Sequence, residues 1–293
     1  MVSSKKPEWL KKRVSFNEEI RATRKILNEL ELNTVCENAR CPNLSECFSK
    51  NTATFMIMGN ICTRNCKFCA VASGTPETLN PEEPAQIAEA VKKLNLKHVV
   101  ITSVTRDDLK DGGAEHFKKC VEAIRKLDKE IVIELLIPDL KFNKKALDTV
   151  TASKPDILNH NVETVPGLYS KVRPEAEYNR SLQVLQYIKE SDNDIYTKSG
   201  LMLGLGETET QVIKVMKDLR RISCDILTLG QYLQPGSTHY PVQDYIKPAQ
   251  FNQYRKIGKE LDFKYIASGP YVLSSYQAEE FSKTFFKLSI WAL

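Results

Sequence analysis

Short apolar runs rich in β-branched residues alternate along the chain with amphipathic stretches. The runs cover residues 52–59, 98–104, 131–138, 157–164, 198–206 and 225–233. The stretches between them carry apolar residues at helical spacing, as in Ile87, Val91 and Leu94, in Phe117, Val121 and Ile124, and in Val212, Val215, Met216 and Leu219. A last helix is predicted over 248–262. Six strand–helix units in succession predict a parallel sheet, because parallel neighbours need a crossover connection.

The number of units sets the fold. A closed barrel of this kind has eight units, so six units predict an α/β fold with a partial (β/α)6 TIM-type barrel. An open doubly wound sheet is the alternative. We expect the barrel over 52–265, an N-terminal extension over 1–51 and a C-terminal cap over 266–293. In the extension, Asn17 is predicted to cap a helix, whose apolar positions Ile20, Ile26, Leu27 and Leu30 would dock on the barrel. In either fold the active site lies at the C-terminal ends of the strands.

Composition narrows the functional class. The chain has 293 residues, of which 42% are apolar and 27% charged, and its net charge of +5 comes from 42 basic and 37 acidic residues. This diffuse excess does not predict nucleic-acid binding, although it would weakly favour an acidic protein partner. No apolar run approaches the roughly 20 residues that span a bilayer, and the basic start lacks the apolar core of a secretory signal. We therefore expect a cytoplasmic protein without membrane contact, in which eight cysteines indicate metal or redox chemistry.

Six of the cysteines form two incomplete ligand sets. Cys62, Cys66 and Cys69 have the spacing C-x3-C-x2-C directly after the first apolar run, and Cys36, Cys41 and Cys47 have the spacing C-x4-C-x5-C upstream of it. Zinc sites usually contain a C-x2-C pair on each side, which only the downstream triplet supplies. Iron–sulfur clusters bind thiolates and can hold an iron with a non-protein ligand, so they are favoured over zinc. Cys120 and Cys224 are predicted to be buried, inert thiols.

The downstream triplet, with Phe68 before its last cysteine, resembles the radical S-adenosylmethionine superfamily. The resemblance implies a 4Fe–4S cluster on Cys62, Cys66 and Cys69, whose open iron is chelated by the methionine moiety of S-adenosylmethionine. One electron then splits the sulfonium and yields a 5′-deoxyadenosyl radical that takes hydrogen from an unactivated carbon. The stretches "DDLKDGGAEHF", "NHNVET" and "GLMLGLGE" are similar to the same superfamily. They imply cofactor contacts from Phe68, Gly112, Gly113, Asn161, Glu163, Met202 and Glu207.

Two further residues have open interpretations. Arg173 would bind the S-adenosylmethionine carboxylate or the substrate, or else pack at a helix start before Pro174. His160 would line the cavity or serve as a structural histidine with its hydrogen bonds satisfied.

The upstream triplet narrows the resemblance. Together with "KPEWLKKR", "ELLIPD", "NHNVETVPGLYSKVRP" and "QYLQPGSTHYPV", it is closely similar to the lipoyl synthase family. The resemblance implies that Cys36, Cys41 and Cys47 bind an auxiliary 4Fe–4S cluster, which is consumed as the source of two sulfurs. These sulfurs enter C6 and C8 of an octanoyl chain on a lysine of a carrier protein. No catalytic side chain is implied beyond the cluster ligands.

The family signature R-S-S-Y is present as Leu273, Ser274, Ser275 and Tyr276. It implies that Ser275 gives its oxygen to the fourth iron of the auxiliary cluster, with Ser274 as the alternative, while two serines in a local turn are a further alternative. Leu273 in place of arginine removes a charge and puts the anchoring of the serines in doubt.

The implied partners are an octanoylated lipoyl-carrier domain or the glycine cleavage H protein, and an electron donor such as flavodoxin or ferredoxin. A monomer is the default. Competing hypotheses are a biotin-type sulfurtransferase, a methylthiotransferase and a non-enzymatic zinc or iron–sulfur protein. The spacing and position of the upstream triplet favour the lipoyl synthase family over the other radical enzymes.

Overall fold

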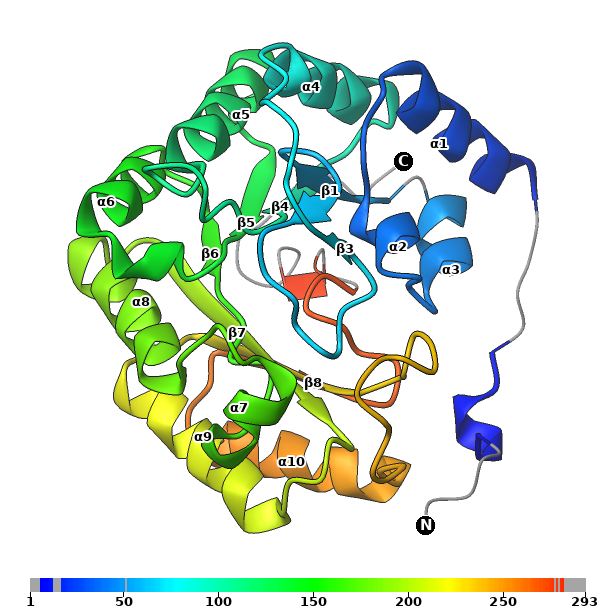
Figure 1. The fold of residues 1–293 in the computed structure, drawn as a ribbon, viewed down its shortest axis with the longest axis vertical. Helices are drawn as coiled ribbons and strands as arrows, with labels where there is room; N and C mark the ends of the chain where they lie inside the picture. The colour runs from blue at the N-terminus through cyan, green and yellow to red at the C-terminus, as the bar shows by residue number, and fades with distance from the viewer. Residues whose placement is uncertain (1–5, 13–16, 51, 277, 279, 282–293) are drawn as a thin grey trace.

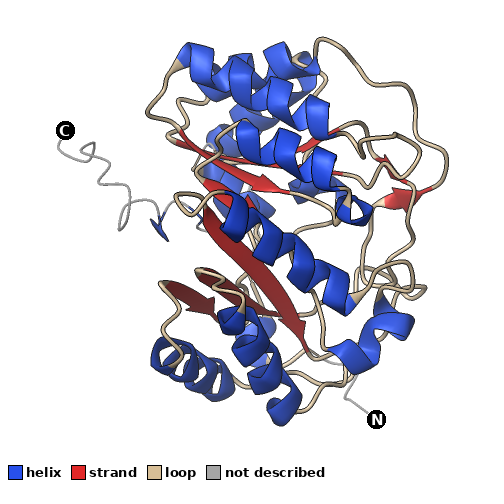
Figure 2. Ribbon diagram, turned by 90° about the vertical axis from the view of Figure 1, so that its left-hand side faces the viewer, coloured by secondary structure: helices blue, strands red, loops and turns tan. Residues whose placement is uncertain are grey.

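A parallel sheet of seven strands curves around the centre of the molecule, with helices on its outer face (Figures 1 and 2). The computed structural model describes residues 6–12, 17–50, 52–276, 278, 280 and 281. The sheet has the order β1-β4-β5-β6-β7-β8-β9, and each neighbouring pair is parallel. Its strands are β1 Thr54–Ile57, β4 His98–Ser103, β5 Val132–Leu136, β6 Ile157–Asn159, β7 Tyr196–Leu203, β8 Ile226–Gln231 and β9 Tyr265–Ser268. Two short strands, β2 Ile61–Cys62 and β3 Ala72–Ser73, pair in the loop after β1.

Helices connect successive strands of the sheet. The crossover helices are α4 Glu83–Lys93, α5 Ala114–Leu127, α6 Lys144–Ala152, α7 Tyr169–Val172, α8 Tyr178–Ser191, α9 Glu209–Arg221 and α10 Pro248–Glu260. Ahead of the barrel lie α1 Glu18–Glu29, α2 Val35–Asn38 and α3 Leu44–Ser49. Short 3-10 helices span η1 Glu8–Leu10, η2 Leu140–Phe142 and η3 Pro166–Leu168.

The partial barrel predicted from the sequence is confirmed, and the structure adds a seventh strand. Each of the six predicted runs overlaps a strand of the sheet. The seventh strand, β9, follows α10 and crosses the boundary that the sequence analysis drew at residue 265. Its four residues are only alternately buried, so no continuous apolar run marks it. The sheet ends at β1 on one side and at β9 on the other, which leaves the barrel open between them.

The predicted apolar stripes form the core. Every residue of the three helical stripes is buried. The Ile20 backbone N–H donates to Asn17 Oδ1 over 3.1 Å, which confirms the helix cap. Ile20 and Leu27 of α1 are buried in the same cluster as β1, so the extension docks on the barrel. Cys120 and Cys224 are fully buried, as predicted.

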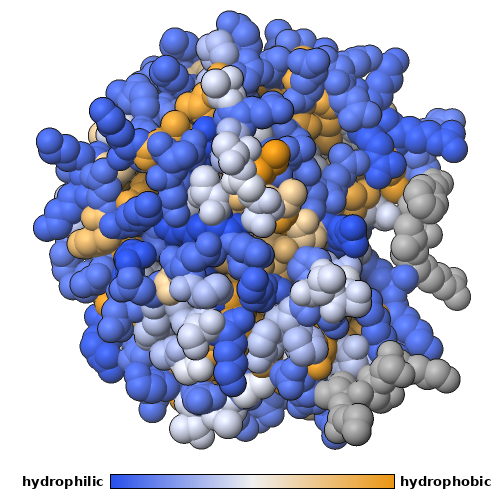
Figure 3. Space-filling model, in the orientation of Figure 1, coloured by the Kyte–Doolittle hydropathy of each residue, from blue (hydrophilic) through white to orange (hydrophobic). Residues whose placement is uncertain are grey.

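The N-terminal helices and the described residues after β9 both enclose the barrel interior. Helices α2 and α3 lie next to β1 on the open side of the sheet, beside the loop with β2 and β3 (Figure 1). At the opposite end of the strands, Phe281 packs against Val132, Ile157 and Ile226. The chain that follows β9 therefore reaches from one end of the barrel to the other. Polar residues dominate the face seen in Figure 3, and more apolar atoms show between them toward its centre. Among the described residues, no helix is long and apolar enough to cross a membrane.

Candidate active site

A cavity of about 540 Å³ opens inside the curve of the sheet, where the strands end. This volume lies in the usual range for ligand sites. The segments that enclose it are the loop after β1, the region of α2 and α3, the ends of β4 to β8, and residues 270–276. All six cysteines of the two triplets line it, namely Cys36, Cys41, Cys47, Cys62, Cys66 and Cys69. The structure thus brings together the two ligand sets that the sequence separates.

The downstream triplet lies on the loop that follows β1. Cys62 Sγ accepts backbone N–H groups from Arg64 over 3.4 Å and from Thr105 over 3.3 Å. The Lys67 N–H donates to the Val172 carbonyl over 2.9 Å. These contacts tie the loop to segments that follow β4 and β6.

Arg64, inside this triplet, fixes the loop to the barrel through two carboxylates. Its guanidinium binds Asp107 over 2.7 and 3.0 Å and Asp139 over 2.7 and 3.0 Å. Asp139 is buried. Burial alone would raise its pKa, yet the hydrogen bonds and charge of Arg64 hold the pKa of the Asp139 carboxyl well below its usual range. The sequence analysis missed Arg64, although its place between two predicted ligands was a signal.

The upstream triplet lies on α2, α3 and the turn between them. Thr34 caps α2 by accepting the Glu37 N–H, which places Cys36 in the core. The Asn43 N–H donates to Cys41 Sγ over 3.4 Å, and Cys47 follows in α3.

Burial makes most of these thiols hard to ionise. It raises the pKa of Cys36, Cys47 and Cys69 to about 12. It also raises the pKa of Cys41 and of Cys66. A thiol binds metal as the thiolate, so a bound cation must offset the cost of ionisation. Buried thiols grouped in threes around one cavity therefore fit iron ligation.

Within the described part of the chain, no three His, Cys, Asp or Glu side chains are grouped so that they could hold a single metal ion. A structural zinc site gathers four ligands around one ion. A 4Fe–4S cluster is larger, because each thiolate binds a different iron.

The cavity wall formed by the segment after β6 is polar and strained. Glu163 adopts a φ of 63°, a region that non-glycine residues rarely occupy, and backbone hydrogen bonds to Gly200 and Met202 hold it there. Burial raises the pKa of its carboxyl. Asn161 Nδ2 donates to Glu163 Oε1 over 3.1 Å, and Arg173 Nη1 donates to the Asn161 carbonyl over 3.0 Å.

This wall carries polar groups that can bind a polar ligand. Asn161 Oδ1 is buried and has no hydrogen-bond partner among the described residues, which a native structure rarely leaves unexplained. Arg173, Met202 and Phe68 line the cavity beside it. His160 also lines the cavity, while its Nδ1 lies 2.9 Å from the Ile137 carbonyl. Burial lowers the pKa of His160 to about 4, so its imidazole is neutral near pH 7.

Three predicted cofactor contacts lie away from this cavity lining. Gly112 and Gly113 precede α5 with φ angles of 61° and 91°, and a Cβ at Gly113 would lie 2.2 Å from Met58 Sδ. Their conformation and packing explain why glycine stands there. Glu207 accepts the backbone N–H groups of Gly204 and Leu205 over 2.6 and 2.9 Å, which closes the loop after β7.

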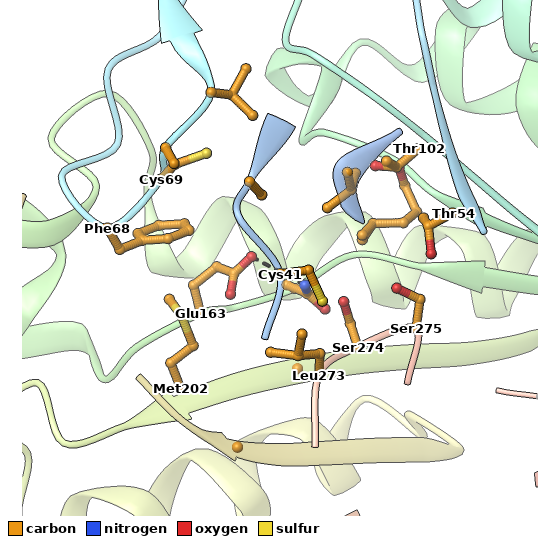
Figure 4. A pocket seen from close by; sticks show the side chains of 18 of the residues that line it. Cys41, Thr54, Phe68, Cys69, Thr102, Glu163, Met202, Leu273, Ser274 and Ser275 are labelled. Atoms are coloured by element: carbon orange, nitrogen blue, oxygen red, sulfur yellow. Dashed lines mark hydrogen bonds between the residues drawn. The ribbon is translucent and has the colours of Figure 1, made fainter. Parts of the chain in front are cut away.

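The serine segment, residues 270–276, lies beside the upstream triplet. Figure 4 shows Ser274 and Ser275 together with Cys41 and Thr54, while Phe68 and Cys69 lie on the other side of the cavity. Ser275 also lines a second, small hollow of about 30 Å³ with Cys47, which Ser274 does not.

Solved structures share the fold at low sequence identity. Methylornithine synthase has a TM-score of 0.56 at 12% identity, over 94% of this chain and 93% of that chain. The FeFe-hydrogenase maturase HydG from Carboxydothermus hydrogenoformans has a TM-score of 0.59 at 16% identity, over 72% of this chain and 52% of that chain. These similarities concern the fold alone.

The family model described as the radical SAM superfamily matches residues 56–219, the stretch that carries the downstream triplet and most of the barrel. The fold and the site therefore define a radical SAM protein. Lipoyl synthase from Caldanaerobacter subterraneus subsp. tengcongensis is 56% identical, over 94% of this chain and 96% of the relative. Lipoyl synthase from Aquifex aeolicus is 55% identical, over 88% and 93%. The chain belongs to the lipoyl synthase family.

Proposed function

We propose that this protein inserts two sulfur atoms, at C6 and C8, into an octanoyl group that is attached to a lysine of a lipoyl-carrier protein. The observation that carries the proposal is the pair of cysteine triplets lining one cavity. Family membership supports the reaction class, and the serine segment beside the upstream triplet supports two separate cluster sites.

The downstream site would hold the radical cluster and its cofactor. Cys62, Cys66 and Cys69 are the proposed cluster ligands. S-adenosylmethionine supplies, when bound, a radical that removes hydrogen from unactivated carbon. The wall that holds Asn161 and Arg173 would bind the polar groups of S-adenosylmethionine. Asn161 Oδ1 has no hydrogen-bond partner among the described residues and is available as an acceptor. Phe68, Glu163 and Met202 complete the proposed contacts, whereas roles for Gly112, Gly113 and Glu207 in cofactor binding stay predictions.

The upstream site would hold the sulfur-donating cluster. Cys36, Cys41 and Cys47 are its proposed ligands, with Ser275 as the fourth. Ser275 is favoured over Ser274 because it shares a second hollow with Cys47. A hard oxygen ligand holds iron less firmly than a fourth thiolate would, which suits a cluster that must give up sulfur.

Each of the three predicted parts of the chain belongs to one of the two proposed cluster sites. The extension, 1–51, and the cap, 266–293, would share the upstream site, and the barrel, 52–265, the downstream site. An octanoylated carrier domain or the glycine cleavage H protein would present the substrate, and a flavodoxin or ferredoxin would supply electrons.

Anaerobic turnover tests the proposal. Protein, S-adenosylmethionine, a reductant and an octanoyl-lysine peptide are incubated together, and the peptide is weighed by mass spectrometry. The expected product is heavier by two sulfurs less two hydrogens. A peptide of unchanged mass, formed while 5′-deoxyadenosine accumulates, would refute sulfur insertion. Stoichiometric zinc in a colourless protein would refute both clusters.

A further inference from the structure

Lys12 connects three segments that are far apart in the sequence. Its Nζ lies 2.7 Å from Asn43 Oδ1 and 2.7 Å from Glu46 Oε2, both in the upstream cysteine region. The same ammonium lies over the rings of Tyr271 and Tyr276, at 5.1 and 5.5 Å from their centroids. Both tyrosines belong to the serine segment. The Lys12 ammonium, from the N-terminal part of the chain, therefore contacts both the start of α3 and the serine segment.

The partners of Lys12 also bind one another. Asn43 Nδ2 donates to the Tyr271 carbonyl over 2.8 Å. Tyr276 Oη donates to Glu46 Oε1 over 2.9 Å. The side chains of Lys12 and Glu46 are only 27% and 28% exposed. Such a partly buried, hydrogen-bonded network fixes geometry better than an exposed ion pair does.

Three of the four partners of Lys12 adjoin a proposed cluster ligand. Asn43 donates its backbone N–H to Cys41, Glu46 precedes Cys47, and Tyr276 follows Ser275. The network therefore sets how the two serines lie relative to the upstream thiols.

The serine segment has no charge of its own. Its sequence, "PYVLSSY", contains Leu273 where the family signature has arginine. The segment also packs closely against β8. A Cβ at Gly230 of β8 would lie 1.7 Å from the Val272 carbonyl oxygen, so the two backbones are in direct contact there. Lys12 brings a cation to this segment from the N-terminal part of the chain, over the rings of Tyr271 and Tyr276.

We propose that Lys12 is a positioning residue that anchors the serine segment beside Cys41 and Cys47, in place of a charge within the segment. The first half of the proposal, that Lys12 docks the serine segment, does not depend on what reaction the protein catalyses. That docking serves sulfur insertion rests on the proposed function.

The test compares Lys12→Ala with Lys11→Ala. Lys11 is the matched control, because its ammonium contacts Glu8 and not the network. Backbone hydrogen exchange, read by mass spectrometry on the anaerobically purified protein, should rise about tenfold in residues 270–276 of Lys12→Ala, which is the scale of one charge-assisted hydrogen bond. Exchange in β4 and β5 should stay unchanged. Sulfur insertion should fall about tenfold while 5′-deoxyadenosine formation persists.

Two more variants separate anchoring from general damage. Lys12→Arg keeps the cation and should restore most of the protection and the activity. Tyr276→Phe keeps the ring under Lys12 but loses the hydrogen bond to Glu46, so its effect should be smaller than that of Lys12→Ala. Wild-type exchange in residues 270–276 of Lys12→Ala would overturn the proposal. Raised exchange with full sulfur insertion would overturn the functional half of it, whereas a wild-type protein that inserts no sulfur would refute the proposed function and leave the anchor intact.

Discussion

The downstream triplet comes from one continuous loop, 62–69, whereas the upstream triplet meets its serine segment only through contacts among three distant parts of the chain. The loop is held to the barrel by Arg64, whose carboxylate partners follow β4 and β5. The upstream region is held to the serine segment by Lys12, Asn43 and Glu46.

This difference separates the two sites in stability. The loop follows the edge strand β1, but Arg64 ties it to residues that follow β4 and β5 inside the sheet. Core strands open locally at a higher free-energy cost than chain ends do. The upstream site depends on the first and last parts of the chain, where local opening costs least free energy. Damage to the chain ends should therefore remove sulfur insertion before it removes radical formation.

The largest expected effect comes from removing one ligand of each triplet. Cys66→Ala should abolish cleavage of S-adenosylmethionine, because too few thiolates remain to hold the radical cluster. Cys41→Ala should leave cleavage measurable and abolish sulfur insertion. Chromatography of 5′-deoxyadenosine and mass spectrometry of the peptide measure the two activities. Iron should fall from about eight to about four per chain in either variant. Cleavage that survives in Cys66→Ala would contradict the assignment of the triplets.

The next effect comes from Arg64. Among the described residues, Arg64→Leu leaves the buried Asp139 with Arg180, at 3.3 Å, as its one ion-pair partner, and breaking a buried pair costs about 3–5 kcal/mol. We expect a lower free energy of unfolding in urea and loss of the downstream cluster. Arg24→Leu is the control, because its pair with Glu37 is 41% and 35% exposed and is worth about 1 kcal/mol or less. Equal urea midpoints for the two variants would show that Arg64 does not fix the loop.

A smaller effect on iron content, with a large effect on product, is expected at Ser275. Ser275→Ala keeps three thiolates, so much of the auxiliary cluster should assemble while sulfur insertion falls strongly and 5′-deoxyadenosine persists. Ser275→Cys should give a brown, stable and poorly active protein, because a thiolate holds iron more firmly. Ser274→Ala is the matched control and should do less. Wild-type sulfur insertion by both Ser275 variants would return the segment to a local turn.

Features formed by residues close together in the chain could be predicted from the sequence, whereas contacts between distant segments could not. Six apolar runs located six strands, because parallel strands buried on both faces read as continuous apolar stretches. Cysteine spacing singled out both triplets, and the structure places all six of these cysteines around one cavity. The Lys12 network was not predicted. Its members Glu46 and Tyr276 are 230 positions apart, and no local pattern reports such a contact.

Gly113 was singled out by a sequence motif, and the structure gives a separate, conformational reason for glycine at this position. The resemblance assigned it to the cofactor, yet its φ of 91° and its packing against Met58 already require glycine. This backbone geometry does not test the predicted contact of Gly113 with the cofactor, which stays a prediction.

The smallest expected effect is the pH dependence that Glu134, buried on β5, gives to the stability of the fold. Glu134 is fully buried, and its two oxygens each lie 2.9 Å from Lys198 Nζ. Burial alone would raise its pKa, but Lys198 and His98 lower the pKa of Glu134 to about 2, against an ordinary 4.5. Because the folded state binds this proton less readily than the unfolded state, the stabilisation is complete above about pH 4.5. It is lost as the pH falls from there toward 2.

Urea unfolding at pH 7, 5 and 3.5, followed by circular dichroism, measures this dependence. The contribution of Glu134 to the free energy of unfolding should be constant between pH 7 and 5 and should decline at pH 3.5. Glu134→Gln should be less stable at pH 7, because it leaves Lys198 buried without a carboxylate, and should lose less stability on acidification. Glu130→Gln, at an exposed position, is the control and should follow the wild type. An identical loss of stability in Glu134→Gln and the wild type would show that this carboxylate does not link the barrel to pH. Acid sensitivity would then have to come from other carboxyls whose pKa is lowered in the folded protein, such as Asp139 and Asp225.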